Sequence, residues 1–135
     1  MKKKIAIVVS KFNKEITMKM KKRAIERTKG LMVDIVKIVE VPGSFEIPLA
    51  VQRLLQNKNI DGVVTIGAII KGGTGHDEVI AHAIAKKLLD LSIQYNKPVS
   101  LGISGPNMTW KKAEDRIDEY ATRAVDAVVM MLRKK

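Results

Sequence analysis

"GVVTIGAIIKGGTGHDEVIAHAIAKKLLDLSIQYN", residues 62–96, joins an unbroken apolar run to a long amphipathic stretch through a short glycine-rich segment. The apolar run, residues 62–70, has the length and the β-branched content of a strand that is covered on both faces. Apolar residues then recur at the helical spacing of three or four, at Ile80, Ile84, Leu88 and Leu91. The stretch therefore predicts a buried strand, a glycine loop and a helix, which is the repeating unit of a parallel α/β fold.

The rest of the chain repeats this alternation. Three further strands are predicted at residues 4–10, 32–41 and 97–104, and three further helices at residues 14–30, 45–59 and 109–135. Gly30 is a typical residue to end a helix, and Pro48 is tolerated only in or near a first turn. We therefore predict a single domain over residues 1–135, an α/β, flavodoxin-like three-layer α/β/α sandwich with a four-stranded parallel sheet.

Composition narrows the class of protein. The chain has 135 residues, no cysteine, and 25 Lys and Arg against 14 Asp and Glu, a net charge of +11. Without cysteine there is no disulfide framework and no thiolate metal site. No apolar run reaches the roughly 18 residues of a membrane span, and the basic start is followed by too short an apolar run for a secretory signal, so we expect a cytoplasmic location and no membrane partner. The charge permits nucleic-acid binding, but no known binding module accompanies it, and we expect no nucleic-acid partner.

The first two strand-to-helix junctions carry unusual residues, and ligands of open parallel sheets bind at the carboxyl ends of strands. Phe12 and Asn13 follow the first strand: the ring suggests packing on a flat ligand or a lid over the core, and Asn13 is also a suitable helix cap. Ser44, Phe45 and Glu46 follow the second strand. Ser44 can cap the next helix and Phe45 can pack, yet their backbone groups also face the expected crevice, and a helix start stabilises the Glu46 carboxylate.

The third junction is the glycine segment of the opening stretch. Gly72, Gly73 and Thr74 would present free N–H groups at a helix start, which is a site for phosphate, although the P-loop signature is absent. His76 follows at the start of the apolar helix face. The positive end of the helix dipole disfavours the imidazolium, so a neutral ring able to accept a proton is expected; a histidine that only caps or packs is the alternative.

The last predicted helix has an apolar stripe beside a charged flank. Arg116 and Arg123, seven residues apart, share the flank, with Asp126 further round. The flank is either solvated or in contact with another subunit. The stripe consists of Ala113, Ile117, Tyr120, Ala124, Val128 and Met131. Taken alone, the junction residues predict an α/β domain that binds a flat polar ring and a phosphate and has one histidine for proton transfer; they do not identify the reaction.

The junction motifs, taken in order, resemble the lumazine synthases. The resemblance rests on the Phe-Asn pair after the first strand, on "VPGSFEIPLA" and on "GAIIKGGTGHDEV", while "KPVSLGISGPNMT" is similar to the archaeal-type, short-chain branch; it runs from about Ile5 to Met131. It implies condensation of 5-amino-6-(D-ribitylamino)uracil with 3,4-dihydroxy-2-butanone 4-phosphate, giving 6,7-dimethyl-8-ribityllumazine, phosphate and water in riboflavin biosynthesis. No metal and no organic cofactor is implied.

The resemblance also implies roles for individual residues. His76 would transfer protons, Phe12 would stack on the pyrimidinedione, and Arg116 would be the cationic partner of the phosphate. The backbone at residues 68–70 would line the ring pocket, and residues 44–46 would hold the ribityl chain. The substrate-binding residues are then Phe12, Asn13, Ser44, Phe45, Glu46, Ala68, Ile69, Ile70, Gly73, Thr74, Leu101 and Arg116.

Two departures from the family pattern stand out. Leu101 occupies a position where many bacterial members have a second phenylalanine, so its contact with the ring would be aliphatic. The segment after Arg116 is "IDEYATR" in place of a glycine- and lysine-rich one, and Arg123 takes the second basic position. Family members form pentamers, sometimes stacked or built into shells, with active sites between neighbouring subunits. The resemblance therefore implies a homo-oligomer but does not specify its number of subunits.

Two alternatives remain open from the sequence. An archaeal-type riboflavin synthase would share the fold, but its reaction has no phosphorylated substrate, and the glycine-threonine segment argues against it. A flavin-binding module without catalysis would need the ring pocket but neither His76 nor Arg116.

Overall fold

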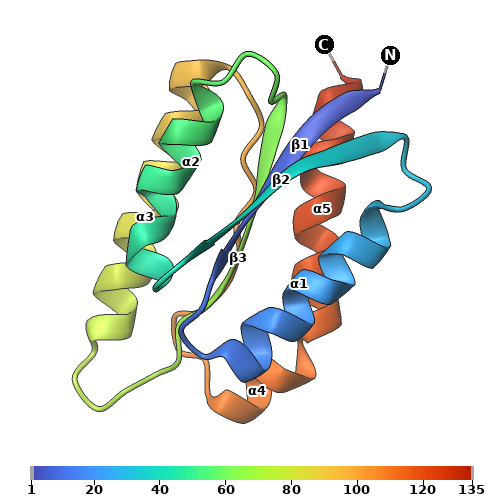
Figure 1. Ribbon diagram of the computed structural model, residues 1–135. Helices are drawn as coiled ribbons and strands as arrows, with labels where there is room; N and C mark the ends of the chain where they lie inside the picture. Colours follow the sequence, from blue (N-terminus) through green and yellow to red (C-terminus); the bar gives the residue numbers. More distant parts are fainter. Residues whose placement is uncertain (1, 135) are drawn as a thin grey trace.

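The computed structural model describes residues 2–134. Four strands form one parallel sheet in the order β2-β1-β3-β4. Their bounds are Lys3–Ser10 (β1), Val33–Val41 (β2), Gly62–Ala68 (β3) and Gly102–Ser104 (β4). Helices lie on both faces of the sheet (Figure 1), and the predicted flavodoxin-like α/β/α sandwich is confirmed.

The helices divide between the two faces. Helices α2 and α3 cover one face, and α1 and α5 cover the other (Figure 1). The bounds are Lys14–Thr28 (α1), Ile47–Leu55 (α2), His76–Tyr95 (α3), Trp110–Asp115 (α4) and Ile117–Arg133 (α5), with a short 3-10 helix, η1, at Ser44–Glu46. Pro48 lies in the first turn of α2, as expected. No helix within residues 2–134 has the length and apolar character needed to cross a membrane.

Strand β1 is the centre of the core because both of its faces are covered. Ile5, Ile7 and Val9 are fully buried against α1 and α5, while Ala6 and Val8 are fully buried against the α2 and α3 side. Each fully buried branched side chain stabilises the fold by roughly 1.5–3 kcal/mol. Strand β3 is buried along its whole length as well, so the carboxyl ends of these two strands form a rigid base for the loops that follow them.

Helix α5 lies close to the sheet because the strands beneath it carry glycine. A Cβ atom at Gly62 would lie 2.8 Å from Val128 Cγ1. A Cβ atom at Gly102 would lie 2.8 Å from the Ala124 methyl and would also collide with the Thr65 carbonyl oxygen. The sheet and the helix therefore meet at two points where only a hydrogen atom fits.

Strand β4 is shorter than the predicted strand at residues 97–104. The Thr65 hydroxyl donates to the Ser100 carbonyl at 2.7 Å and accepts from the Gly102 N–H at 3.3 Å. The Thr65 side chain therefore takes the place of backbone hydrogen bonds from β3 to the Ser100 carbonyl and the Gly102 N–H. Before β4, residues 97–101 are paired with β3 by a single bridge, between Val63 and Val99. Leu101 lies between the two bonded residues and is 51% exposed.

Two other predictions about the elements are wrong in detail. The predicted helix at residues 109–135 is broken at Arg116, which has φ −112° and ψ 15° and separates α4 from α5. No glycine or proline marks this position. Met131, predicted to be in the core stripe, is 59% exposed, and the buried positions of α5 include Ala121, Val125 and Val129 instead.

Candidate active site

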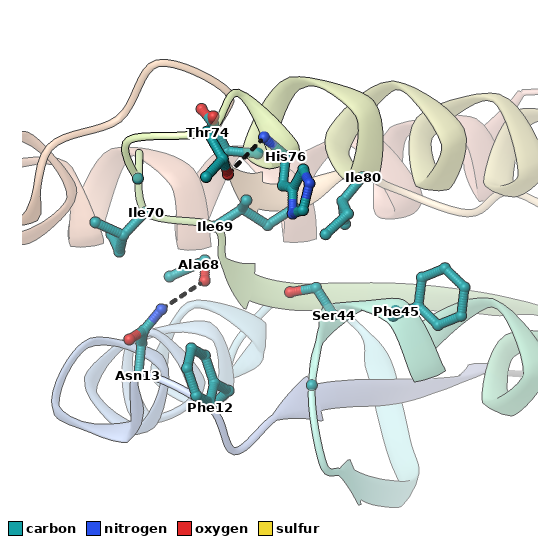
Figure 2. Close-up of a pocket in the computed structure, with 13 residues that line it drawn as sticks. Phe12, Asn13, Ser44, Phe45, Ala68, Ile69, Ile70, Thr74, His76 and Ile80 are labelled. Atoms are coloured by element: carbon teal, nitrogen blue, oxygen red, sulfur yellow. Dashed lines mark hydrogen bonds between the residues drawn. The ribbon is translucent and has the colours of Figure 1, made fainter.

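The three junctions that the sequence singled out surround one cavity of about 290 Å³. It lies beyond the carboxyl ends of β1 and β3, beside η1 and the start of α3 (Figure 2). Its lining consists of Phe12, Asn13, Gly43, Ser44, Phe45, Ala68, Ile69, Ile70, Gly72, Thr74, His76, Asp77 and Ile80. Segments far apart in the sequence are therefore brought together where an open parallel sheet places its ligand.

Asn13 ties the first junction to the third strand. It stands at the N-cap position of α1 in the left-handed conformation, with φ 62°, but its side chain makes no cap hydrogen bond. Its Nδ2 instead donates to the Ala68 carbonyl at 2.9 Å. Asn13 is therefore at the expected N-cap position, but its side chain does not cap the helix and instead connects two walls of the cavity.

Two aromatic rings stand open at this site. Phe12 and Phe45 are each 70% exposed, so Phe12 is not a lid packed on the core. Exposed rings of this size leave apolar area in water that a flat ligand can cover by stacking. In Figure 2, Phe12 lies on the side of the cavity opposite Thr74 and His76. The cavity thus has an aromatic ring on one side and the polar side chains of Thr74 and His76 on the other.

The second junction contributes Ser44 but not Glu46. Gly43, not Ser44, precedes the first turn of η1, and Ser44 makes no cap hydrogen bond, so the capping role predicted for it is wrong. Its hydroxyl fills the space that a side chain at Gly67 would take, 2.8 Å from where that Cβ atom would be. Glu46 lies outside the cavity, in a neighbouring groove between β2 and α2.

The third junction presents backbone donors. Gly75, at φ 77°, is the N-cap of α3, and the Thr74 hydroxyl accepts only a long bond of 3.5 Å from the His76 N–H. Within residues 2–134, no hydrogen bond occupies the amides of residues 72–75. Free amides at a helix start form an anion site. Gly72 and Thr74 line the cavity, whereas Gly73 is exposed beside it.

His76 lies in the first turn of α3, exposed at the cavity wall. Its ring makes no hydrogen bond to the rest of residues 2–134, so both ring nitrogens are available to a ligand. It lies on the same side of the cavity as Thr74 and Ile80 (Figure 2). Since the side chain is exposed, a histidine that only packs against the core is excluded.

Asp77 and Ile80 are lining residues that the sequence interpretation missed. Ile80 was placed on the core face of the helix, but it is only partly buried. Asp77 is 6% exposed, and its Oδ2 accepts from the Asn107 N–H at 3.0 Å. An acidic residue in the first turn beside the glycine loop was the available signal.

Among residues 2–134, no three His, Asp or Glu side chains are grouped as metal ligands.

Leu101 and Arg116 lie away from the cavity of their own chain. Leu101 borders a separate cavity of about 190 Å³, with His82 and Pro106. Arg116 stands at the break between α4 and α5, with its side chain about half exposed and its Nη1 3.9 Å from Glu119 Oε2. One copy of the chain therefore does not bring the two predicted ligand contacts to its own site.

Comparison with known proteins identifies the family. The family model described as 6,7-dimethyl-8-ribityllumazine synthase matches residues 2–135. The chain is 53% identical to the 6,7-dimethyl-8-ribityllumazine synthase of Metallosphaera sedula, over 97% of this chain and 87% of that protein. It is 51% identical to that of Methanopyrus kandleri (97% and 92%) and 50% identical to that of Staphylothermus marinus (97% and 87%). The chain therefore belongs to the 6,7-dimethyl-8-ribityllumazine synthase family.

Proposed function

We propose that the cavity between Phe12 and His76 is the active site in which this chain performs the lumazine-forming condensation of its family. The substrates are the ribitylaminouracil and the phosphorylated dihydroxybutanone. The observation that carries the proposal is the opposition of an aromatic wall to a loop of free amides that ends in an unpaired histidine. A flavin-binding module would have no use for the second feature.

Substrate positions follow from the chemistry of the walls. The phosphate group binds the amides of residues 72–75, where the N-terminus of α3 favours negative charge. The pyrimidinedione lies between Phe12 and the wall formed by residues 68–70, whose side chains are apolar. The ketone carbon would then lie near His76, because His76 directly follows residues 72–75, here called the phosphate loop. Proximity of the two reactants supplies much of the rate enhancement.

His76 moves the protons. The reaction requires attack of an amine on a ketone, loss of water to form an imine, elimination of phosphate and closure of the second ring. Each of these steps transfers a proton, and an imidazole can accept and donate one near neutral pH. Its exposed ring at the cavity wall is placed to reach the reacting atoms.

Replacement of His76 by alanine should lower kcat at least about tenfold, although a positioned acid–base group typically contributes roughly 10²–10⁴-fold. The expected minimum lies below that range because phosphate is a good leaving group and substrate groups assist. Binding of the pyrimidine, followed by calorimetry, should change little. An intact kcat with a collapsed pyrimidine affinity would make His76 a binding residue instead.

The site is completed by a second copy of the chain. At about 290 Å³ the cavity lies at the lower end of the roughly 300–1,000 Å³ typical of small-molecule sites, yet two substrates must enter it. Arg116 and Leu101 are exposed away from it. A neighbouring copy that contributes these residues would enclose the substrates and supply a cation for the phosphate.

We expect the active protein to be at least pentameric. Light scattering combined with activity measurements tests this, and an active monomer at micromolar concentration would contradict the shared site. A sharper test mixes two impaired variants, His76→Ala and Arg116→Ala, at a concentration of the phosphorylated substrate well below KM, and lets their subunits exchange. If neighbouring copies share a site, some mixed sites contain both native residues and activity returns; separate sites in each chain give no recovery.

The direct test of the function is to mix both substrates with the protein and follow lumazine absorbance and fluorescence. Omission of the phosphorylated substrate is the control. Tight binding of lumazine or a flavin without product formation would favour the binding module.

A further inference from the structure

The phosphate loop has little internal structure to fix its shape. A Cβ atom at Gly72, Gly73 or Gly75 would meet no other part of the protein within 4 Å. Among the bonds that the structure describes for residues 2–134, the one side-chain bond within the loop is the 3.5 Å contact of Thr74. Glycine-rich backbone is costly to order when a ligand binds. Something outside the loop must therefore hold its two ends in place.

Both ends are bonded to the same stretch, residues 104–108, which runs from the last residue of β4 into the connection to α4. Before the loop, the Ile69 N–H donates to the Ser104 carbonyl and the Lys71 N–H donates to the Met108 carbonyl, both at 2.8 Å. After the loop, Asp77 Oδ2 accepts from the Asn107 N–H at 3.0 Å. The first two bonds use backbone alone, and the third is the only one that depends on a side chain.

The connecting segment is itself held closely in place. A Cβ atom at Gly105, where φ is 122°, would lie 2.7 Å from the Ile69 carbonyl oxygen, so the segment is in direct contact with the residue that follows β3. Asn107 is in the left-handed region, at φ 60°, and its N–H meets the buried Asp77 carboxylate. The α3 end of the loop is thus bonded to a segment that is in contact with the end of β3 through Gly105.

We propose that Asp77 is a positioning residue, which holds the α3 end of the phosphate loop against the β4–α4 connection by accepting the Asn107 N–H. The inference rests on the proposed function, since it assumes that this loop binds the substrate phosphate. The role requires an acceptor oxygen at position 77, not a negative charge. Asp77 acts through the loop and need not touch the reacting atoms.

The test compares three variants by steady-state kinetics with both substrates. Asp77→Ala removes the acceptor and should raise KM for the phosphorylated substrate by about fivefold or more, because the hydrogen bond that holds the loop is lost, with KM for the pyrimidine within about twofold of wild type. Asp77→Asn keeps a side-chain oxygen and should restore KM to near the wild-type value. Glu78→Ala, an exposed acid in the same helical turn, controls for the loss of first-turn charge and should change little.

Hydrogen exchange of the loop is the second measurement, and it does not depend on activity. The amides of Lys71 and Asn107, which are hydrogen-bonded on either side of the contact between the loop and its support, should exchange faster in Asp77→Ala than in wild type, Asp77→Asn or Glu78→Ala. Unchanged exchange in Asp77→Ala, or an Asp77→Asn variant as impaired as Asp77→Ala, would overturn the positioning role. If exchange responds as expected but KM for the phosphorylated substrate is the same in Asp77→Ala as in wild type, Asp77 still positions the loop. In that case the loop does not bind the substrate phosphate, and it is the proposed function that fails.

Discussion

Replacement of Arg116 by alanine should raise KM for the phosphorylated ketone tenfold to a hundredfold and leave KM for the pyrimidine within about twofold. A charge-assisted contact to phosphate contributes about 1.5–3 kcal/mol, and each 1.4 kcal/mol corresponds to roughly a factor of ten. Arg116 is free to make this contact, since its only ion pair within residues 2–134 is the long one to Glu119. Steady-state kinetics with each substrate varied in turn gives both values.

Arg116→Lys is the matched control. It keeps the charge but loses the planar pair of donors that suits phosphate, so its KM should lie between those of wild type and Arg116→Ala. An equal rise of both KM values in Arg116→Ala would mean that Arg116 serves assembly and not the phosphate.

Replacement of Gly102 by alanine should lower the free energy of unfolding by about 3 kcal/mol, the upper part of the roughly 1–3 kcal/mol usual for overpacked cores. The added methyl group would collide with the Thr65 carbonyl oxygen and lie 2.8 Å from Ala124 Cβ. Backbone atoms cannot move aside as the end of a flexible side chain can. Urea denaturation at a fixed protein concentration measures the change, because an oligomer's apparent stability depends on concentration.

Gly72→Ala is the control for that variant. No atom lies within 4 Å of its Cβ position, so the free energy of unfolding should stay within about 0.5–1 kcal/mol of wild type. Equal losses in the two variants would show that the conformational freedom of glycine, and not the lack of space beside Thr65 and Ala124, determines the cost.

The fold and the place of the site could be predicted because their signals are local. Residues 62–70 are apolar without interruption, and the helix face from Ile80 to Leu91 has a clear period. Glycine, proline and asparagine marked the junctions, and the rules of parallel sheets then brought the junctions together. Nine of the residues assigned from the family resemblance, including Phe12, Ser44 and His76, line the cavity.

What the sequence did not reveal depends on contacts between distant residues. The bond from Asn13 to Ala68 spans 55 residues, and that from Asn107 to Asp77 spans 30. Neither pairing has a local pattern, so the sequence around Asn13 indicates only a helix cap, and the sequence around Asp77 gives no sign of its partner. The break between α4 and α5 at Arg116 is not marked by a glycine or a proline in the sequence. Arg116 and Leu101 lie outside the cavity of their own chain, and no local pattern indicates this.

The hydroxyl of Thr65 has a consequence for how this sequence can drift in evolution. Position 65 is fully buried, and valine has the same shape as threonine, so a criterion of volume alone would exchange them freely. Valine would strip the Ser100 carbonyl and the Gly102 N–H of their shared partner, which leaves two buried polar groups unsatisfied. Serine would keep both bonds at the expense of a methyl group. Selection at this position therefore acts on hydrogen bonding. Thr65→Val changes the shape of the side chain least, but Thr65→Ser is the substitution more easily accepted.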